Sequence, residues 1–266
     1  MTPVVTYLFV PGDRPERFAK AMASGADRIV LDLEDAVQPD QKASARRSVL
    51  DADLDWQRVV VRINDAASPF FADDLKFLTQ CQIGAVLLPK AETPDMLMTV
   101  AASYGRTVEL LPLVETARGL ANLPALLKVE ATSRAVFGHL DFALDLGCST
   151  DWSSLLCFRA QMVFQSRLAN VLPPVDGITT DFKNADAARA DAQAARLLGF
   201  GGKLLIHPAQ VAPVAAAFAP TLEEVTWAKR VLAAIDGQAG AVALDGKMID
   251  KPVKEAALRI LARAKV

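Results

Sequence analysis

The chain has 266 residues, of which 52% are hydrophobic, and its 29 basic and 31 acidic residues give a formal net charge of −2. This balance offers no electrostatic footprint for nucleic acid or for an anionic membrane surface. No apolar run reaches the roughly 18–20 residues of a membrane span, and the first residues lack the basic start and long apolar stretch of a secretory signal. The three cysteines form no CxxC pair, which indicates reduced thiols and a cytoplasmic protein.

Eight short and nearly continuous apolar runs follow one another along the chain, each separated from the next by about one strand-and-helix unit. Such runs are typical of parallel strands that are covered on both faces. They span 4–10, 28–34, 58–63, 85–90, 108–115, 134–141, 175–181 and 203–208. Helical patterns lie between them, for example the alanine-rich stretch that opens at Asn184 and ends in glycines.

Eight strands that alternate with helices in a chain of this length predict an α/β fold, a closed (β/α)8 TIM barrel, over residues 1–237. An open, doubly wound sheet is the structural alternative, but no GxGxxG motif follows the first strand. Residues 238–266 are glycine-punctuated and then helical, and they exceed what the barrel needs. We expect them to form a lid or an intersubunit segment.

Charged residues gather where the predicted strands end. In such barrels the chemistry lies at the carboxyl ends of the strands, because the loops there converge on one mouth. The polar residues at or just past these ends are Arg14, Asp32, Glu34, Asp35, Arg62, Asn64, Lys90, Glu92, Glu115, His139, Asp141, Asp181 and His207. A ring of such residues indicates a polar site at the barrel mouth.

Glu115 and Asp141 are the last acidic groups of neighbouring predicted strands. Two carboxylates side by side repel each other unless a proton or a cation lies between them. Oxygen donors without cysteine or paired histidines suit Mg²⁺, which takes one or two carboxylates and leaves its other positions to water and substrate. The alternative is that each carboxylate caps the helix that follows it.

Arg62 lies inside an apolar run, where an unpaired guanidinium would be costly. It pairs either with Glu34 or Asp35, as a structural ion pair across strands, or with a carboxylate of the substrate, which matches an arginine fork at two points. Together with Asp32, these acids either support Arg62 and metal-bound waters or form a polar network inside the barrel.

Six motifs in the chain together resemble the citrate lyase beta-subunit family, within the group of the HpcH/HpaI aldolases. In order, they are LFVPGDRPERFAKAMASGADRIVLDLEDAV, VRIN, LLPKAE, LVETARGL, FGHLDFALDLG and LGFGGKLLIHPAQ, and the resemblance extends over residues 7–252. It implies a (β/α)8 barrel that binds Mg²⁺ and cleaves or forms a carbon–carbon bond between an acyl-CoA and an α-keto acid. The implied substrate is a 3-hydroxy-3-carboxyacyl-CoA thioester of the citryl-, citramalyl- or malyl-CoA type.

The resemblance also implies roles for single residues of the predicted mouth. Glu115 and Asp141 match the metal ligands, so that Glu115 also lies at the substrate. Arg62 matches the clamp on the keto-acid carboxylate, and Glu34 and Asp35 match catalytic groups that hold metal-bound waters. These assignments are what the resemblance adds to the pattern of charges.

Two further implied regions lie away from these carboxylates. Arg14 and Lys20 look like part of an edge that binds the CoA moiety. The segment LDGKMIDKP resembles the C-terminal part of stand-alone malyl-CoA and citramalyl-CoA lyases, in which the residue matching Asp250 acts as acid/base in a neighbouring subunit of a trimer. The alternative for Asp250 is a helix N-cap.

Alternatives remain at the level of the whole protein. A thioesterase that hydrolyses malyl-CoA is compatible with the same scaffold, and so is a non-catalytic subunit of a lyase complex. The paired carboxylates beside a buried arginine favour an enzyme over a scaffold. The sequence does not decide which keto acid is the substrate.

Overall fold

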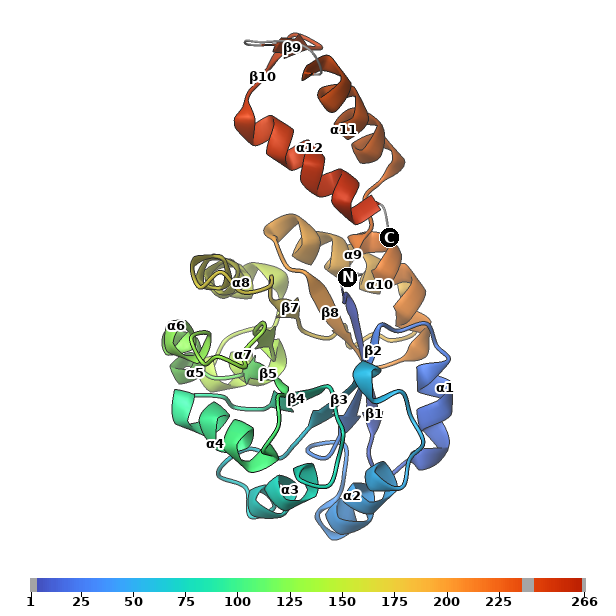
Figure 1. The fold of residues 1–266 in the computed structure, drawn as a ribbon, viewed down its shortest axis with the longest axis vertical. Coiled ribbons are helices and arrows are strands. Elements are labelled where there is room, and N and C mark those ends of the chain that lie inside the picture. The colour runs from blue at the N-terminus through green and yellow to red at the C-terminus, as the bar shows by residue number, and fades with distance from the viewer. Residues whose placement is uncertain (1–3, 236–241, 265–266) are drawn as a thin grey trace.

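The computed structural model, which describes residues 4–235 and 242–264, shows eight parallel strands closed into a barrel (Figure 1). Each strand pairs with the next along the chain, and β8 pairs with β1. The strands are β1 (Thr6–Pro11), β2 (Arg28–Asp32), β3 (Val59–Arg62), β4 (Ala85–Leu88), β5 (Glu109–Val114), β6 (Val136–Phe137), β7 (Val175–Asp176) and β8 (Gly202–Leu205). The predicted TIM barrel is confirmed, and each predicted strand overlaps an observed one.

Helices cover the outside of the barrel. They are α1 (Phe18–Met22), α2 (Lys42–Leu50), α3 (Phe71–Leu78), α4 (Pro94–Tyr104), α5 (Ala117–Ala121), α6 (Leu123–Leu126), α7 (His139–Leu146), α8 (Trp152–Leu168), α9 (Ala185–Leu198) and α10 (Val211–Phe218). Helix α9 begins as predicted, because Asn184 accepts a hydrogen bond from the backbone of Ala187 at 3.0 Å. It ends at Gly199, whose φ of 114° suits a residue without Cβ.

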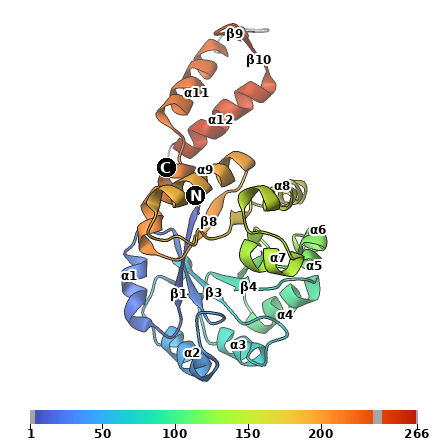
Figure 2. The same cartoon turned by 180° about the vertical axis from the view of Figure 1, so that it is seen from behind.

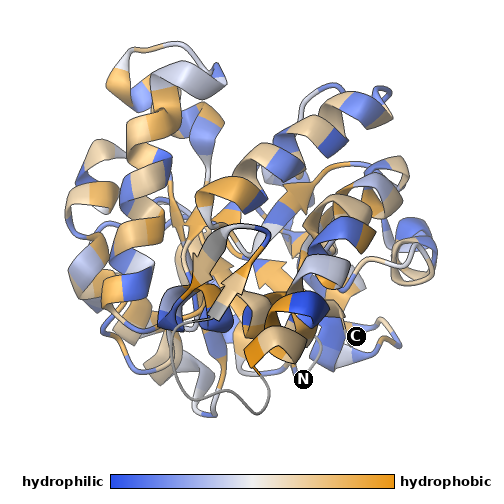
Figure 3. Cartoon of the chain, turned by 90° about the horizontal axis from the view of Figure 1, so that it is seen from above, coloured by the Kyte–Doolittle hydropathy of each residue, from blue (hydrophilic) through white to orange (hydrophobic). Residues whose placement is uncertain are grey.

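The hydrophobic core has two layers because successive side chains of a strand point to opposite faces. The inner layer fills the barrel and consists of Tyr7, Val30, Val60, Ala85, Leu87, Leu111, Leu113, Val136, Val175 and Leu204. The outer, larger layer lies between strands and helices and includes Leu8, Ile29 and Val61. Figure 3 shows the strands largely in the hydrophobic colour, with hydrophilic residues among the surrounding helices.

The same alternation decides which polar residues enter the barrel. Asp32 and Arg62 lie two residues beyond the inner-layer Val30 and Val60, and Glu115 lies two residues beyond Leu113. All three therefore point inward above the apolar layer, at the carboxyl ends of their strands.

The C-terminal part of the chain forms an arm that projects from the barrel (Figures 1 and 2). It consists of α11 (Leu222–Ile235), the hairpin β9 (Val242–Leu244) and β10 (Lys247–Ile249), and α12 (Lys251–Ala264). Its elements pack together through Ala228, Val231, Ile249 and Ala257. The domain boundary that the sequence predicted after residue 237 lies outside the described residues. Helix α11 precedes that position, but it packs in the same hydrophobic cluster as α12 and therefore belongs to the arm. Over 4–235 and 242–264, no helix combines the length and apolarity that crossing a membrane requires.

Candidate active site

A cavity of about 370 Å³ opens at the carboxyl ends of the strands. The polar side chains that line it are Asp32, Asp35, Arg62, Glu115, His139 and Asp141. Residues that are far apart in the sequence therefore meet at one mouth, as the strand-end pattern predicts. The arrangement places two candidate metal ligands and the candidate carboxylate clamp in the same cavity.

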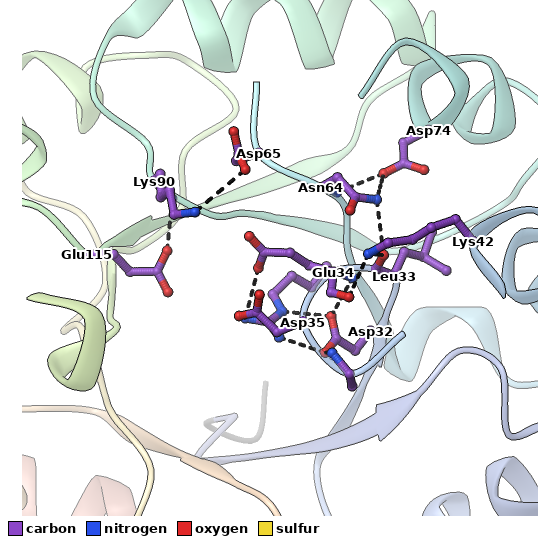
Figure 4. A network of polar contacts seen from close by, with 12 residues as sticks. Asp32, Leu33, Glu34, Asp35, Lys42, Asn64, Asp65, Asp74, Lys90 and Glu115 are labelled. Carbon is purple, nitrogen blue, oxygen red and sulfur yellow. Dashed lines mark hydrogen bonds and ion pairs between the residues drawn. The ribbon is translucent and has the colours of Figure 1, made fainter. Parts of the chain in front are cut away.

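Arg62 is held by an ion pair across β2 and β3. The register sets Asp32 beside Arg62, and Nε and Nη2 of the arginine donate to the two oxygens of Asp32 at 2.7 and 2.6 Å. The remaining Nη1 lies 3.0 Å from Oε2 of Glu34 and 3.5 Å from Oδ2 of Asp35 (Figure 4). The structural ion pair is thus present, with Asp32 as the partner that receives the fork, whereas the sequence pointed to Glu34 or Asp35. Burial alone would lower the pKa of Arg62, but these carboxylates raise it, so the guanidinium stays charged.

Glu34 is an acid whose ionised form is only partly compensated by its surroundings. The side chain is buried, and within the described residues its Oε2 has no hydrogen-bond partner, because Nη1 of Arg62 is close but badly oriented. Burial raises the pKa of Glu34 to about 8, with Arg62 opposing the rise and Asp35 and Glu115 adding to it. The carboxyl group needs a proton or a further cation nearby.

Glu115 reaches the cavity from the end of β5 and is almost fully buried. The backbone N–H of Lys90 donates to its Oε2 at 3.0 Å, and Lys90 adopts a left-handed φ of 46° (Figure 4). Burial raises the pKa of Glu115 to about 7, and the charges of Asp141 and Asp35 contribute to the rise. A Cβ on Gly138 would lie 2.3 Å from Cγ of Glu115, so the glycine makes room for this side chain.

Asp141 was expected at the end of a strand over 134–141, and this expectation is wrong. Strand β6 ends at Phe137, and Asp141 lies in the first turn of α7, because the chain turns into the helix at Gly138. Asp141 is exposed, lines the cavity and makes no hydrogen bond or ion pair with any described residue. Its position in the first turn suits an acidic side chain.

The capping alternative does not account for Glu115. The N-cap of α5 is Thr116, whose hydroxyl accepts a hydrogen bond from the backbone of Gly119 at 3.0 Å. Helix α7 has Gly138 as its N-cap and no side-chain capping bond. Glu115 is therefore available to the cavity rather than engaged at a helix end, and Asp141, although it lies in the first turn of α7, makes no capping hydrogen bond.

The donor set fits Mg²⁺. Over residues 4–235 and 242–264, no group of three or more His, Cys, Asp or Glu side chains is arranged to hold a metal ion. Two carboxylates, Glu115 and Asp141, are nevertheless what Mg²⁺ commonly takes from a protein when water and substrate complete its shell. The unpartnered Oε2 of Glu34 and the raised pKa of Glu115 both mark negative charge that a divalent cation would neutralise.

The loop after β2 is fixed by Lys42, which the sequence did not bring to attention, and by Asn64, which belongs to the predicted ring. The ammonium of Lys42 is buried and donates to the carbonyls of Leu33 and Glu34, both at 2.7 Å (Figure 4). Asn64 donates to the carbonyl of Leu33 at 3.0 Å and to Asp74 at 2.6 Å. These contacts hold the acidic loop over the cavity.

A second buried ionic network lies outside the barrel wall, between β7, β8 and α8. Asp176 accepts from Nε of Arg159 at 2.9 Å and from Nζ of Lys203 at 3.1 Å. His139 lies close to this network and lines the cavity, with its buried Nδ1 unpartnered among the described residues. Burial lowers the pKa of His139 to about 4, so the imidazole is neutral. No role for Asp176, Arg159 or Lys203 was predicted from the sequence.

The remaining predicted residues do not line the cavity. Arg14 follows β1, is exposed and binds Glu16 at 2.7 Å, and Lys20 is exposed on α1. Asp250 lies in the arm between β10 and α12, where its Oδ1 accepts from the backbone of Val253 at 3.1 Å. The helix-cap alternative for Asp250 is thus realised, and β10 and α12, which flank the residue, belong to the arm that projects from the barrel (Figure 1).

A larger cavity, of about 490 Å³, lies at the opposite end of the barrel. Its lining is mostly apolar, and the buried Arg134 beside it donates to the carbonyls of Pro173 and Val4. At this end of such barrels, polar residues serve stability rather than chemistry. The smaller cavity is therefore the candidate active site.

The chain is similar to known proteins over most of its length. Residues 6–208 match the family model of the HpcH/HpaI aldolase/citrate lyase proteins. The chain is 35% identical to a citrate lyase subunit beta-like protein of Mycobacterium tuberculosis over 97% of its length and 94% of that protein. It is 33% identical to the (3S)-malyl-CoA thioesterase of Cereibacter sphaeroides, over 98% of this chain and 95% of that one. It is 32% identical to the mitochondrial citramalyl-CoA lyase of Rattus norvegicus, over 97% and 85%.

A solved structure is similar over the whole chain. It is the protein CitE from Mycobacterium tuberculosis in complex with magnesium, acetoacetate and coenzyme A, with a TM-score of 0.90 and 34% identity. The match covers 100% of this chain and 98% of that one. The similarity therefore includes the arm as well as the barrel.

Proposed function

The chain belongs to the HpcH/HpaI aldolase/citrate lyase family, and from that premise we propose that it is a Mg²⁺-dependent carbon–carbon lyase. Its substrate is a 3-hydroxy-3-carboxyacyl-CoA thioester of the citryl-, citramalyl- or malyl-CoA type, and its products are acetyl-CoA, or a related acyl-CoA, and an α-keto acid. Relatives described as acyl-CoA lyases and a relative crystallised with magnesium and coenzyme A support this assignment.

One observation carries the proposal: Glu115 and Asp141 share a cavity with the charged fork of Arg62. The two acids would hold Mg²⁺, which supplies a Lewis acid and a template for the carboxylate and the neighbouring oxygen of the substrate. Nη1 of Arg62 is the part of the guanidinium not engaged by Asp32, and it would orient the same carboxylate. A site with this preorganised charge stabilises the anion that develops during cleavage.

The chemistry requires two proton transfers. The hydroxyl proton leaves, the bond between the carbinol carbon and the α-carbon of the thioester breaks, and the electron pair becomes the thioester enolate. We assign the acceptance of the hydroxyl proton, through a water molecule, to Glu34 and Asp35 beside Arg62. The pKa of Glu34, raised by burial to about 8, lies in the range that suits a general base.

The second proton transfer, to the enolate, is assigned to Asp250 of a neighbouring subunit. Asp250 is exposed and lies in the projecting arm, and this position supports delivery to another copy of the chain, in a homotrimer or a multiple of it. Arg14 and Lys20, exposed on the β1 side of the mouth, would contact the CoA moiety. The cysteines of the described residues are free, which suits a cytoplasmic enzyme.

A malyl-CoA-type thioesterase is the second candidate, because a relative of that description is 33% identical over nearly the whole chain. Product analysis with purified enzyme separates the two. A panel of 3-hydroxyacyl-CoA thioesters, with Mg²⁺ or with a chelator, should release keto acid and acyl-CoA only when Mg²⁺ is present. Release of the hydroxy acid and free CoA, without keto acid, would establish the thioesterase instead.

The metal assignment has its own test. We expect Glu115→Gln to weaken Mg²⁺ binding by about 100-fold or more in titration calorimetry, because the neutral amide cannot replace a buried carboxylate ligand. Glu92→Gln is the matched control, since the side chain of Glu92 accepts a hydrogen bond from Thr116 and does not line the cavity. Equal Mg²⁺ affinities of the two variants would remove Glu115 from the metal site.

A further inference from the structure

The wall of the cavity is divided between charge and apolar surface. The acids and Arg62 come from β2, β3, β5 and the start of α7. The contiguous arc formed by β7, β8 and β1 contributes only glycine and apolar side chains, which are Ile178, Leu204, Ile206 and Phe9. Leu204 belongs to the inner layer of the core, and both Leu204 and Ile206 line the cavity, so the apolar surface continues from the core to the mouth.

Positive charge at the cavity is scarce. Among the lysines and arginines of residues 4–235 and 242–264, Arg62 alone lines it. Its fork is bound to Asp32, and its remaining Nη1 faces two further carboxylates. Lys90 comes near through its backbone, but its ammonium lies 3.6 Å from Asp65 and it does not line the cavity. A bound divalent cation and Arg62 therefore face an excess of acidic groups.

This excess of acidic groups over cations restricts which keto acids the cavity can bind. One carboxylate and the keto oxygen are accounted for by the metal and Arg62, and the remaining substituent faces the rest of the cavity. A second carboxylate on that substituent would lose its hydration against an apolar arc without a cation to pair with, and it would be repelled by the acids opposite. A short alkyl group would gain from burial against the same surface.

We propose that the 2-oxo acid released or condensed by this site has a single carboxylate and a short, uncharged alkyl substituent. The proposal rests on the lyase function proposed above and narrows it to thioesters of the citramalyl-CoA class. Pyruvate and oxaloacetate are the probes, because they share the 2-oxo acid group and differ in a methyl against a carboxymethyl substituent.

The experiment compares the two probes in binding and in turnover with the full-length enzyme and saturating Mg²⁺. We expect pyruvate to bind at least about tenfold more tightly than oxaloacetate in calorimetry, and kcat/KM for cleavage of citramalyl-CoA to exceed that for citryl-CoA by about tenfold or more. Equal or better use of the dicarboxylic member would overturn the inference and leave the lyase proposal intact. Absence of keto-acid release from every thioester would overturn the lyase proposal, while the binding comparison would still decide this inference.

A designed cation tests the physical cause. Ile206 is 37% exposed at the rim, and its backbone N–H, which donates to Gln210 at 3.0 Å, is unaffected by a new side chain. We expect Ile206→Lys to shift the binding ratio towards oxaloacetate by about tenfold or more, whereas the uncharged Ile206→Met keeps the preference for pyruvate. A ratio that both variants change equally would show that the missing charge does not set the selectivity.

Discussion

Two buried ionic networks lie on opposite sides of the barrel wall, and they differ in charge balance. The inner network has more acidic than basic groups, and the outer network has more basic than acidic groups. In the first, Arg62 donates to Asp32 at 2.7 and 2.6 Å and lies beside two further acids. In the second, a single acid, Asp176, lies between Arg159 and Lys203 at 2.9 and 3.1 Å. The distances are alike, so contact geometry does not distinguish a site from a scaffold.

The direction of the side chains and the charge balance do distinguish them. Asp32 and Arg62 share the inner face with Val30 and Val60, whereas Asp176 alternates with the inner Val175 and points towards α8. Burial alone would raise the pKa of Asp176, but the charges of Lys203 and Arg159 hold it below its ordinary value. The outer network thus neutralises its own acid, whereas the inner network is left with excess acid at the cavity, where a cation or a substrate group can join it.

The largest effect that would test this comparison is on stability. We expect Asp176→Asn to lower the free energy of unfolding by about 3–5 kcal/mol, because it leaves two buried cations without their counter-ion. Urea unfolding followed by circular dichroism measures the change. The control is Asp186→Asn, which breaks the exposed pair with Arg189 on α9 and should cost far less. Equal losses in the two variants would mean that Asp176 is not the anchor of the outer network.

The sequence predicted the barrel and most of the inner network because both depend on short-range patterns. Apolar runs with strand-and-helix spacing are enough to place eight strands, and acids at their ends are enough to place the mouth. The sequence named Asp32 only as one of three acids near Arg62, because the choice of the fork partner depends on the register of β2 against β3, which puts Asp32 beside it. Glu34 and Asp35, the partners that the sequence favoured, lie close only to Nη1, the third nitrogen of the guanidinium.

The supporting residues were missed for a different reason. Lys42 from α2 contacts the loop after β2, and Asp74 from α3 contacts Asn64 after β3, so both contacts depend on how those helices pack. Asp176 and Lys203 did leave a signal, since each interrupts a predicted apolar strand at a position that alternates with inner residues. The end of β6 was misjudged because an apolar residue, Leu140, follows Gly138 and extends the apolar pattern of the strand. In the structure Leu140 already belongs to α7.

The next effect concerns the shape of the inner network rather than its charge. Gly138→Ala would place a Cβ 2.3 Å from Cγ of Glu115 and 2.7 Å from its Oε1, so the carboxylate must move. We expect Mg²⁺ affinity in calorimetry to fall by about tenfold or more, because a ligand displaced by a fraction of an ångström loses its coordination geometry. A normal urea midpoint would show that the variant is folded. Wild-type affinity in such a folded variant would argue that Glu115 does not contact the metal.

The smallest effect is a pH dependence that only the inner network should show. The pKa of Glu34 is raised by burial from its ordinary value of 4.5 to about 8, so between these values the folded chain keeps a proton that the unfolded chain has lost. A rise in pH through this window therefore favours unfolding, and from pH 7 to 8.5 the metal-free protein should lose about 1 kcal/mol of stability from this group.

Glu34→Gln isolates this contribution, because the amide keeps the shape of the side chain but does not titrate. Urea unfolding in a chelator at pH 7 and 8.5 should show a smaller loss for Glu34→Gln than for the wild type, whereas Asp176→Asn should keep the wild-type slope, since the pKa of Asp176 lies below its ordinary value. The comparison is sharp because both acids are buried and both lie beside an arginine. If Glu34→Gln kept the full slope, the proton lost in this pH window would not come from Glu34, and another group would have to account for the pH dependence.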